Sequence, residues 1–227
     1  MPHVVRLPKG GLIVSCQARD DNPLRGPVFM QAMALAAVQA GARGIRAEGA
    51  ADIAAIRAVL SLPIIGLIKR QDPGFDVYIT PDFAAAKLVA DAGAEVIAID
   101  ATNRPRQGGD LGVLIRRIHD ELGKPVMADI ASLEEAVAAE VAGADYIGST
   151  MAGYTAATAH RTGGPDLELL DQLVRHCQRP VVADGRYDTP DLAAQALRAG
   201  AFAVVVGTAI TNPREITRRF VQAMTAA

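Results

Sequence analysis

Aromatic residues are scarce in this sequence, and tryptophan is absent. They make up 4% of its 227 residues, too few for the stacking surfaces on which single-stranded nucleic acids bind. An excess of either charge is missing as well, since 23 basic residues stand against 25 acidic ones and the net charge is −2. Without a basic surface to neutralise phosphate groups, nucleic acid is not an expected partner.

Long apolar runs and cysteines are also few. No run reaches the roughly 18–20 residues that cross a membrane, and residues 1–6 lack the apolar stretch of a signal peptide. The two cysteines, Cys16 and Cys177, are too few for a disulfide framework. We therefore expect a cytoplasmic protein with no membrane partner.

The sequence does contain two short signals that alternate regularly. The tripeptide Ala-Gly-Ala ends four helix-like stretches, and a glycine just beyond a helix readily takes the left-handed conformation that terminates it. The central glycines are Gly41, Gly93, Gly143 and Gly200. Prolines introduce further apolar runs between them, as they can at the first position of a strand. These prolines are Pro63, Pro125 and Pro180.

Together these signals predict eight strands rich in Val, Ile and Leu, as in a parallel sheet covered on both faces. The strands are expected at 11–17, 44–47, 64–69, 96–100, 126–130, 146–149, 181–184 and 203–207. The helices are expected at 27–40, 50–60, 82–92, 109–122, 132–142, 166–177, 190–199 and 213–225. Their start signals are Pro27, Pro190, Pro213 and a capping box of Ser132 with Glu135. Eight units and no Gly-rich dinucleotide motif favour an α/β fold with a single (β/α)8 TIM barrel, in one domain over 1–227, rather than a doubly wound sheet.

Polar residues stand at or directly after the ends of nearly all the predicted strands. They are Gln17, Arg46, Glu48, Lys69, Arg70, Asp100, Asp129, Ser149, Thr150, Asp184, Gly207 and Thr208. In a barrel these positions converge on one rim, where active sites lie. Each residue taken alone is more typical of a structural role, such as capping the next helix, but their convergence predicts an active site.

Lys69 is the most informative of these residues. Only four of the 23 basic residues are lysine, and a coding preference for arginine accounts for most of that ratio. Lys69 nevertheless lies deep in a strand that should be buried, where loss of solvent and the neighbouring Arg70 lower the pKa of an amine. Such a lysine can act as a general base or form a Schiff base, which arginine cannot. The alternative is a lysine whose stem is buried and whose ammonium reaches water.

Two further groups of residues bear on the chemistry. Gly185, Gly207 and Thr208 follow the last two strands, a frequent phosphate site in barrels, although tight turns would also explain the glycines. The four histidines are scattered and none has a metal-ligand spacing, so we expect no metal site. Cys16 is expected to be a small buried residue rather than a nucleophile.

Several segments, in order, resemble the N-acylmannosamine-6-phosphate 2-epimerase family. They are Gly10-Gly11-Leu12-Ile13-Val14-Ser15-Cys16-Gln17, Gly44-Ile45-Arg46, Ile65-Gly66-Leu67-Ile68-Lys69-Arg70, Ile97-Ala98-Ile99-Asp100-Ala101-Thr102, Ala128-Asp129-Ile130, Tyr146-Ile147-Gly148-Ser149-Thr150, Gly153-Tyr154-Thr155 and Val206-Gly207-Thr208-Ala209-Ile210-Thr211. The resemblance extends from about residue 9 to residue 220 without large gaps. It implies a barrel enzyme, usually a homodimer, that needs no cofactor or metal. Its reaction in sialic acid catabolism interconverts N-acetylmannosamine 6-phosphate and N-acetylglucosamine 6-phosphate.

The resemblance also implies roles for individual residues. Lys69 would remove the proton at C2 of the sugar, with Asp184 as its partner. The substrate-binding residues would be Gln17, Arg46, Asp129, Gly185, Arg186, Gly207 and Thr208, with backbone groups near Gly185 and Gly207 on the phosphate. The partner of this chain would thus be a small phosphorylated amino sugar.

Two positions depart from the family pattern. The family carries Glu where this chain has Asp184, and Arg where it has Asn212 after Thr211. A shorter acid can misplace a catalytic group, and misplacement by about 1 Å costs on the order of 10²-fold. The departures leave open a slower enzyme, a shifted substrate, or a sugar-phosphate-binding barrel that has lost catalysis, with Glu48 or Arg186 as possible compensating residues. A different barrel enzyme with a Schiff-base lysine, such as an aldolase, is the third alternative.

Overall fold

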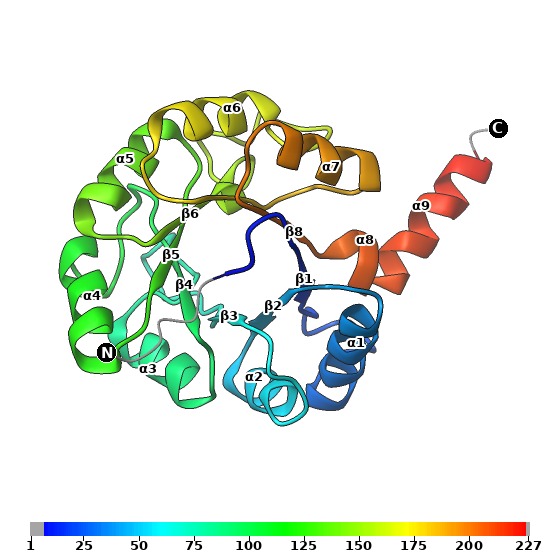
Figure 1. Ribbon diagram of the computed structural model, residues 1–227, viewed down its shortest axis with the longest axis horizontal. Coiled ribbons are helices and arrows are strands. Elements are labelled where there is room, and N and C mark those ends of the chain that lie inside the picture. The colour runs from blue at the N-terminus through cyan, green and yellow to red at the C-terminus, as the bar shows by residue number, and fades with distance from the viewer. Residues whose placement is uncertain (1–6, 226–227) are drawn as a thin grey trace.

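The computed structural model describes residues 7–225 and contains a closed barrel of eight parallel strands (Figure 1). The strands are β1 (Leu12–Cys16), β2 (Gly44–Glu48), β3 (Ile64–Leu67), β4 (Val96–Asp100), β5 (Val126–Asp129), β6 (Tyr146–Gly148), β7 (Val181–Ala183) and β8 (Ala203–Val206). Each strand pairs with the next along the chain, and β8 closes the barrel on β1 with Val206 beside Val14. The predicted barrel is confirmed, and the alternative of a doubly wound sheet is wrong.

Helices surround the barrel, as the alternation of signals predicted (Figure 1). They are α1 (Pro27–Gln39), α2 (Ala50–Arg57), α3 (Phe83–Asp91), α4 (Leu111–Arg117), α5 (Leu133–Ala142), α6 (Leu167–His176), α7 (Pro190–Arg198), α8 (Thr208–Thr211) and α9 (Pro213–Thr225). Three of them begin at a proline, and the glycines of all four Ala-Gly-Ala tripeptides have positive φ angles between 100° and 106°. The prolines predicted to begin helices and the glycines predicted to end them therefore have the roles assigned to them, and β3, β5 and β7 begin directly after the three strand prolines.

The structure also corrects some details of the prediction. The short helix α8 was not predicted, and the helix expected at 109–122 is α4 followed by a π-helical turn, η1 (Ile118–Leu122). A 3₁₀ turn, η2 (Ser149–Met151), follows β6. Ser132 caps α5, but Glu135 accepts hydrogen bonds from the backbone N–H groups of Ala131 and Asn103 instead of completing a capping box.

The core has two layers, one between the barrel and the helices and one inside the barrel. Side chains of a strand alternate between these layers because the period of a strand is two residues. In β5, for example, Val126 and Ala128 pack outward, whereas Met127 packs inside the barrel. Following this alternation to the carboxyl ends of the strands brings polar residues onto the inner face, where the barrel opens.

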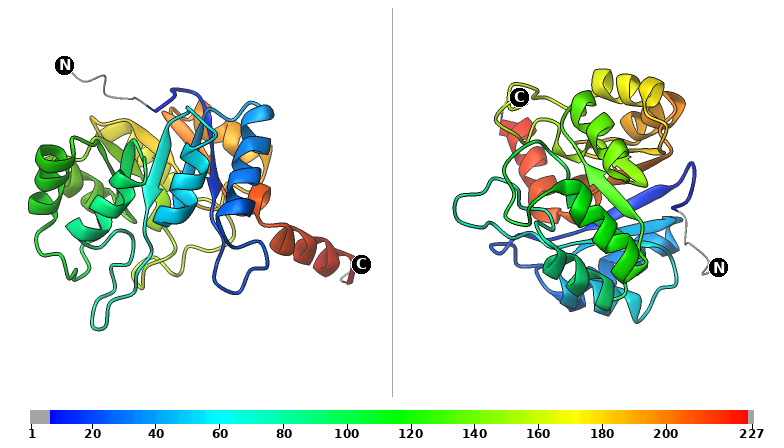
Figure 2. Two further views of the ribbon diagram at one scale, coloured as in Figure 1. Left: turned by 90° about the horizontal axis from the view of Figure 1, so that it is seen from below. Right: turned by 90° about the vertical axis from the view of Figure 1, so that its left-hand side faces the viewer.

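The longer loops project from the carboxyl ends of the strands, at the lower edge of the left view in Figure 2. The same view shows α9 extending away from the barrel, and none of its residues is buried. Across residues 7–225, no helix combines the length and the apolar character needed to traverse a lipid bilayer. Residues 1–6, which carry the prediction that no signal peptide is present, lie outside the described residues.

Candidate active site

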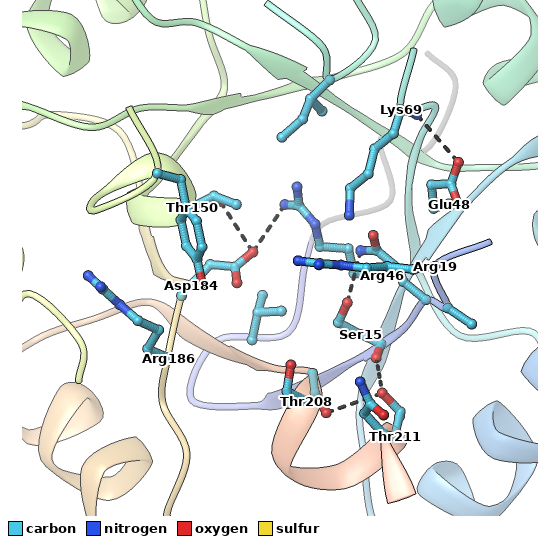
Figure 3. A pocket seen from close by; sticks show the side chains of 18 of the residues that line it. Ser15, Arg19, Arg46, Glu48, Lys69, Thr150, Asp184, Arg186, Thr208 and Thr211 are labelled. Atoms are coloured by element: carbon cyan, nitrogen blue, oxygen red, sulfur yellow. Dashed lines mark hydrogen bonds and ion pairs between the residues drawn. The ribbon is translucent and has the colours of Figure 1, made fainter. Parts of the chain in front are cut away.

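A cavity of about 850 Å3 opens at the carboxyl ends of the strands, a volume in the range of small-ligand pockets. Its walls come from β1, β2 and the segments that follow β1, β3, β6, β7 and β8 (Figure 3). Most of the predicted site residues line it: Gln17, Arg46, Lys69, Asp184, Gly185, Arg186, Gly207 and Thr208. The convergence of these eight residues on one rim is thereby confirmed, whereas Asp100 and Ser149 do not line the cavity. The role of each residue stays a prediction.

Arg46 forms the floor of the cavity together with two carboxylates. Its guanidinium, 1% exposed, donates two hydrogen bonds to the carboxylate of Asp129, and its Nη1 lies 3.2 Å from Oδ2 of Asp184. The hydroxyl of Thr150 donates to Asp129 Oδ1 at 2.6 Å and lies 3.2 Å from Asp184 Oδ2. Asp129 is fully buried and does not line the cavity. It therefore lies beneath the cavity and reaches it through Arg46 and Thr150.

The charges of this floor are strongly coupled. Burial favours the uncharged form of Arg46, but the neighbouring Asp129 and Asp184 outweigh it and raise the pKa of the guanidinium, which is therefore permanently charged. The pKa of Asp184 is also raised. Its burial is the main cause and the nearby Asp129 adds to the increase, although Arg46 opposes it. A carboxyl group whose proton is held more tightly than usual is suited to acid–base chemistry near neutral pH.

Lys69 extends into the cavity toward Arg46 (Figure 3). The structure corrects the expectation that it lies deep in a buried strand, because β3 ends at Leu67 and the Lys69 side chain is exposed within the cavity. Protein atoms nevertheless surround it, and this burial, followed by the positive charge of Arg46, lowers the pKa of the Lys69 amine. A larger fraction of Lys69 is therefore neutral at a given pH than of an ordinary lysine.

The chain folds back on itself directly after Lys69. The backbone of Lys69 pairs antiparallel with Ile79, and the N–H of Thr80 donates to the carbonyl of Ile68 at 2.7 Å. The Lys69 N–H also points at Oε1 of Glu48, 3.4 Å away, at the end of β2. These contacts hold the backbone of Lys69 on two sides, so the amine is presented from a fixed position.

Gln17 offers a polar atom that no protein group satisfies. Its Nε2 donates to the Ser15 hydroxyl at 2.9 Å, whereas its Oε1 is buried and has no partner among the residues described. A buried acceptor without a partner costs free energy. A ligand hydroxyl or N–H that entered the cavity would satisfy it.

Backbone groups of the last two strands form another wall of the cavity. Gly185 has a φ of +103°, which favours glycine, and a Cβ on Gly207 would lie 3.2 Å from the Cβ of Ser15. The Thr211 hydroxyl of α8 donates to the carbonyl of Ser15 at 2.8 Å. The end of β8 is therefore packed closely against β1, with little side-chain bulk between the backbone and the cavity.

Arg186 lines the cavity but is engaged by the protein. Its guanidinium donates to the carbonyls of Arg161 and Ala152 at 2.5 and 3.1 Å and lies over the ring of Tyr154, 5.5 Å from the centroid. Its φ of +61° is uncommon for a residue with a side chain. Gly153 has φ +82°, and a Cβ there would meet this guanidinium at 2.5 Å. Arg186 therefore fastens the segment after β6 to the segment after β7.

Some cavity residues escaped the sequence prediction. Arg19, Tyr78 and Tyr154 lie in loops, and no strand period points to them. Cys16 is fully buried, and burial raises the pKa of its thiol to about 12, which agrees with the predicted structural role. Between residues 7 and 225, no three His, Cys, Asp or Glu side chains are grouped as metal ligands.

The fold and the cavity together define a (β/α)8-barrel enzyme whose site lies at the carboxyl ends of the strands. Comparison with known proteins gives the family. Residues 30–226 match the model of the family described as "Putative N-acetylmannosamine-6-phosphate epimerase". The chain belongs to this family, as the resemblance of its motifs predicted.

The relatives cover nearly the whole chain. A protein of Thermosynechococcus vestitus named "Putative N-acetylmannosamine-6-phosphate 2-epimerase" is 53% identical over 218 residues, which are 96% of this chain and 95% of the relative. One of the same name from Enterobacter sp. (strain 638) is 47% identical and covers 100% of this chain and 97% of its own. The solved structure of the N-acetylmannosamine-6-phosphate 2-epimerase from Clostridium perfringens superposes with a TM-score of 0.93 at 43% identity, over 97% of this chain and 96% of that one.

Proposed function

We propose that this chain interconverts N-acetylmannosamine 6-phosphate and N-acetylglucosamine 6-phosphate by moving a proton at C2. The observation that carries the proposal is Lys69, an amine of lowered pKa that faces the same cavity as the Arg46–Asp184 pair. Membership of the epimerase family supports it, as do relatives that bear the name of this reaction and align over almost the full chain. The comparisons give no support to the aldolase alternative.

The proposed reaction needs only proton transfer. In the open-chain sugar the aldehyde at C1 acidifies the C2–H bond, so that neutral Lys69 can take the proton while the electron pair moves into an enolate. Return of a proton to the opposite face of C2 inverts that carbon, and no electrons are gained or lost overall. Asp184, which follows β7, faces the cavity as a second titratable group, and we assign it the role of partner to Lys69.

The remaining site residues are assigned to binding. Arg46 presents a permanent positive charge on which the developing enolate oxygen can be stabilised, and the unsatisfied Oε1 of Gln17 can accept from the sugar. Asp129 holds Arg46 from beneath. The backbone wall around Gly185, Gly207 and Thr208 is assigned to the phosphate, with Arg186 holding the shape of that wall.

Exchange in deuterated water tests the proposal. We expect N-acetylmannosamine 6-phosphate to give an epimer that carries deuterium at C2, as seen by NMR. Lys69→Met should lower both turnover and exchange by about 10²–10⁴-fold, the usual contribution of a general base. The matched control is Lys87→Met, because Lys87 is on α3, exposed and paired with Asp91. Calorimetric binding without turnover or exchange would contradict the proposal and support a barrel that has lost catalysis.

We further propose that the enzyme is a homodimer in which α9 docks on a second copy of the chain. In a (β/α)8 barrel the helices normally form a ring packed on the strands, but α9 projects from the ring and buries none of its residues (Figures 1 and 2). Phe220, Val221 and Met224 are 67, 56 and 77% exposed along this helix. An identical partner that buries this apolar surface explains why such residues are retained there. Sialic acid catabolism and the cytoplasm, as the setting of the reaction, stay predictions of the resemblance.

A further inference from the structure

Six arginines line the cavity, and five of them are held by partners. Arg46 binds Asp129 and Asp184, Arg70 binds Asp72 and Asp82, Arg25 pairs with Asp20, Arg219 with Asp188, and Arg186 donates to two carbonyls. The sixth is Arg19, whose guanidinium has no hydrogen bond or ion pair with any residue from 7 to 225. Figure 3 shows this side chain stretched into the cavity.

The acidic residues near Arg19 do not neutralise it either. Its loop, 17–26, carries Asp20 and Asp21, which pair with Arg25 and Arg214 respectively. Asp188, which lines the same cavity, pairs with Arg219 at 2.9 Å. The charge of Arg19 therefore extends into the cavity, where it adds to the effects of burial and of Arg46 in lowering the pKa of Lys69.

The loop of Arg19 is the neighbour of the backbone wall formed by β8. Strand β1 pairs with β8, and Thr211 after β8 donates to the carbonyl of Ser15. The contact continues to Asn212, whose Oδ1 lies 3.4 Å from Nδ2 of Asn22 in the Arg19 loop. Asn212 is the position at which the family pattern carries an arginine, and an amide has no charge to replace it.

We propose that Arg19 binds the phosphate group of the substrate and supplies the positive charge that the family takes from position 212. The inference rests on the proposed function, because it assumes a phosphorylated substrate. An arginine without a protein partner can form two parallel hydrogen bonds to a phosphate. It also pays no cost for breaking an existing ion pair when the ligand arrives.

Neither of the two compensating residues considered from sequence is suited to replace the positive charge at position 212. Glu48 is an acid and would repel a phosphate. Arg186 is fastened to the carbonyls of Arg161 and Ala152 and would have to give up those hydrogen bonds. Among the six arginines of the cavity, Arg19 is the one that can bind a ligand without giving up a contact to residues 7–225.

Arg19→Gln tests the inference with two independent measurements. Steady-state kinetics with N-acetylmannosamine 6-phosphate should show KM rising about 10- to 100-fold, as for loss of a charged hydrogen bond, while kcat changes little. Calorimetry with inorganic phosphate should show a parallel loss of affinity. Arg175→Gln is the control, since Arg175 lies on α6, away from the cavity, and is paired with Asp171. We expect it to change KM by less than about twofold.

The sharpest test moves the positive charge from position 19 to position 212. In the double variant Arg19→Gln with Asn212→Arg, KM and phosphate affinity should recover toward the starting values, which a merely structural role for Arg19 would not produce. Unchanged KM and phosphate affinity in Arg19→Gln would overturn the inference while leaving the epimerase proposal intact. Absence of turnover in the unaltered protein would instead overturn the proposed function, and the phosphate titration would still decide on Arg19.

Discussion

The pKa of Lys69 is set by burial and by four neighbouring charges (Arg46, Glu48, Asp184 and Arg19), and the charge of Glu48 can be removed without disturbing the floor of the cavity. Burial and Arg46 lower the pKa of the amine, whereas the carboxylate of Glu48 raises it. Because the neutral amine is the base, activity should increase with pH as Lys69 loses its proton. Glu48→Gln removes the opposing charge, so the pKa of Lys69 falls further and the acidic limb of the kcat/KM profile moves to lower pH.

A pH–rate profile of the two proteins checks this prediction. Glu121→Gln serves as the control, because Glu121 is exposed, pairs with Arg117 on the outside of the barrel and should leave the profile unchanged. An acidic limb that stays in place or moves to higher pH in Glu48→Gln would show that Lys69 is not the group whose deprotonation controls the rate.

Single residues also show how far the sequence could be read. Charges in or just after an apolar strand, as at Arg46, Lys69 and Asp184, line the cavity as the sequence predicted, although β3 ends before Lys69. Arg19 was not predictable, since it lies in a loop whose path depends on contacts with α8 and Asn212. Asp129 follows the strand period but lies under Arg46, a depth that only the packed structure gives.

Arg186 in the segment after β7 contacts the segment after β6, where Gly153 leaves room for its guanidinium. A Cβ on Gly153 would lie 2.5 Å from the Arg186 guanidinium and 2.8 Å from the carbonyl oxygen of Arg161. Gly163 has a similar φ, +85° against +82°, but nothing lies within 4 Å of its Cβ position. Gly163→Ala should thus cost only the backbone strain of about 1–2 kcal/mol.

Gly153→Ala should cost the same strain plus the displacement of Arg186. We expect the free energy of unfolding, measured with urea, to fall further than in Gly163→Ala, and KM for the sugar phosphate to increase in Gly153→Ala alone. Equal losses in the two variants, with KM unaffected, would show that the Arg186 contacts do not shape the cavity.

At the level of elements, prediction was best where a local signal has a single physical meaning. Each Ala-Gly-Ala tripeptide ends a helix because the glycine takes a positive φ. The predicted bounds of helices were wrong where contacts with distant parts of the chain determine the local structure. Helix α8 is only four residues long and is fastened to Ser15 by Thr211, and a turn so short leaves no periodic pattern in the sequence.

The whole molecule is expected to form a dimer through α9. Phe220→Asp places a charge in the middle of the exposed apolar surface, and burying that charge without a partner is unfavourable. Sedimentation should show the mass falling from twice the 23.7 kDa of one chain to the mass of a single chain. The control is Val141→Asp, because Val141 is 85% exposed on α5 and lies outside the proposed contact.

Either of two results would contradict the proposal that α9 forms the dimer contact. The first is a monomer before any substitution is made. The second is a dimer that Val141→Asp dissociates and Phe220→Asp leaves intact, which would place the contact on the α5 side of the barrel. The position of α9 could not be read from its sequence, since an amphipathic helix looks the same whether its apolar face meets its own barrel or another.

The pairing of β8 with β1 has a consequence for how the enzyme matures. Gln17 and Arg19 belong to the first strand and its loop, whereas Gly207 and Thr208 follow the last, and the cavity needs both. A nascent chain that has emerged only as far as α7 lacks Gly207, Thr208 and the strand that closes the barrel. The ability to bind a ligand in the cavity therefore appears late in synthesis, when the last strand closes the barrel. Binding of such a ligand consequently also reports that the barrel is complete.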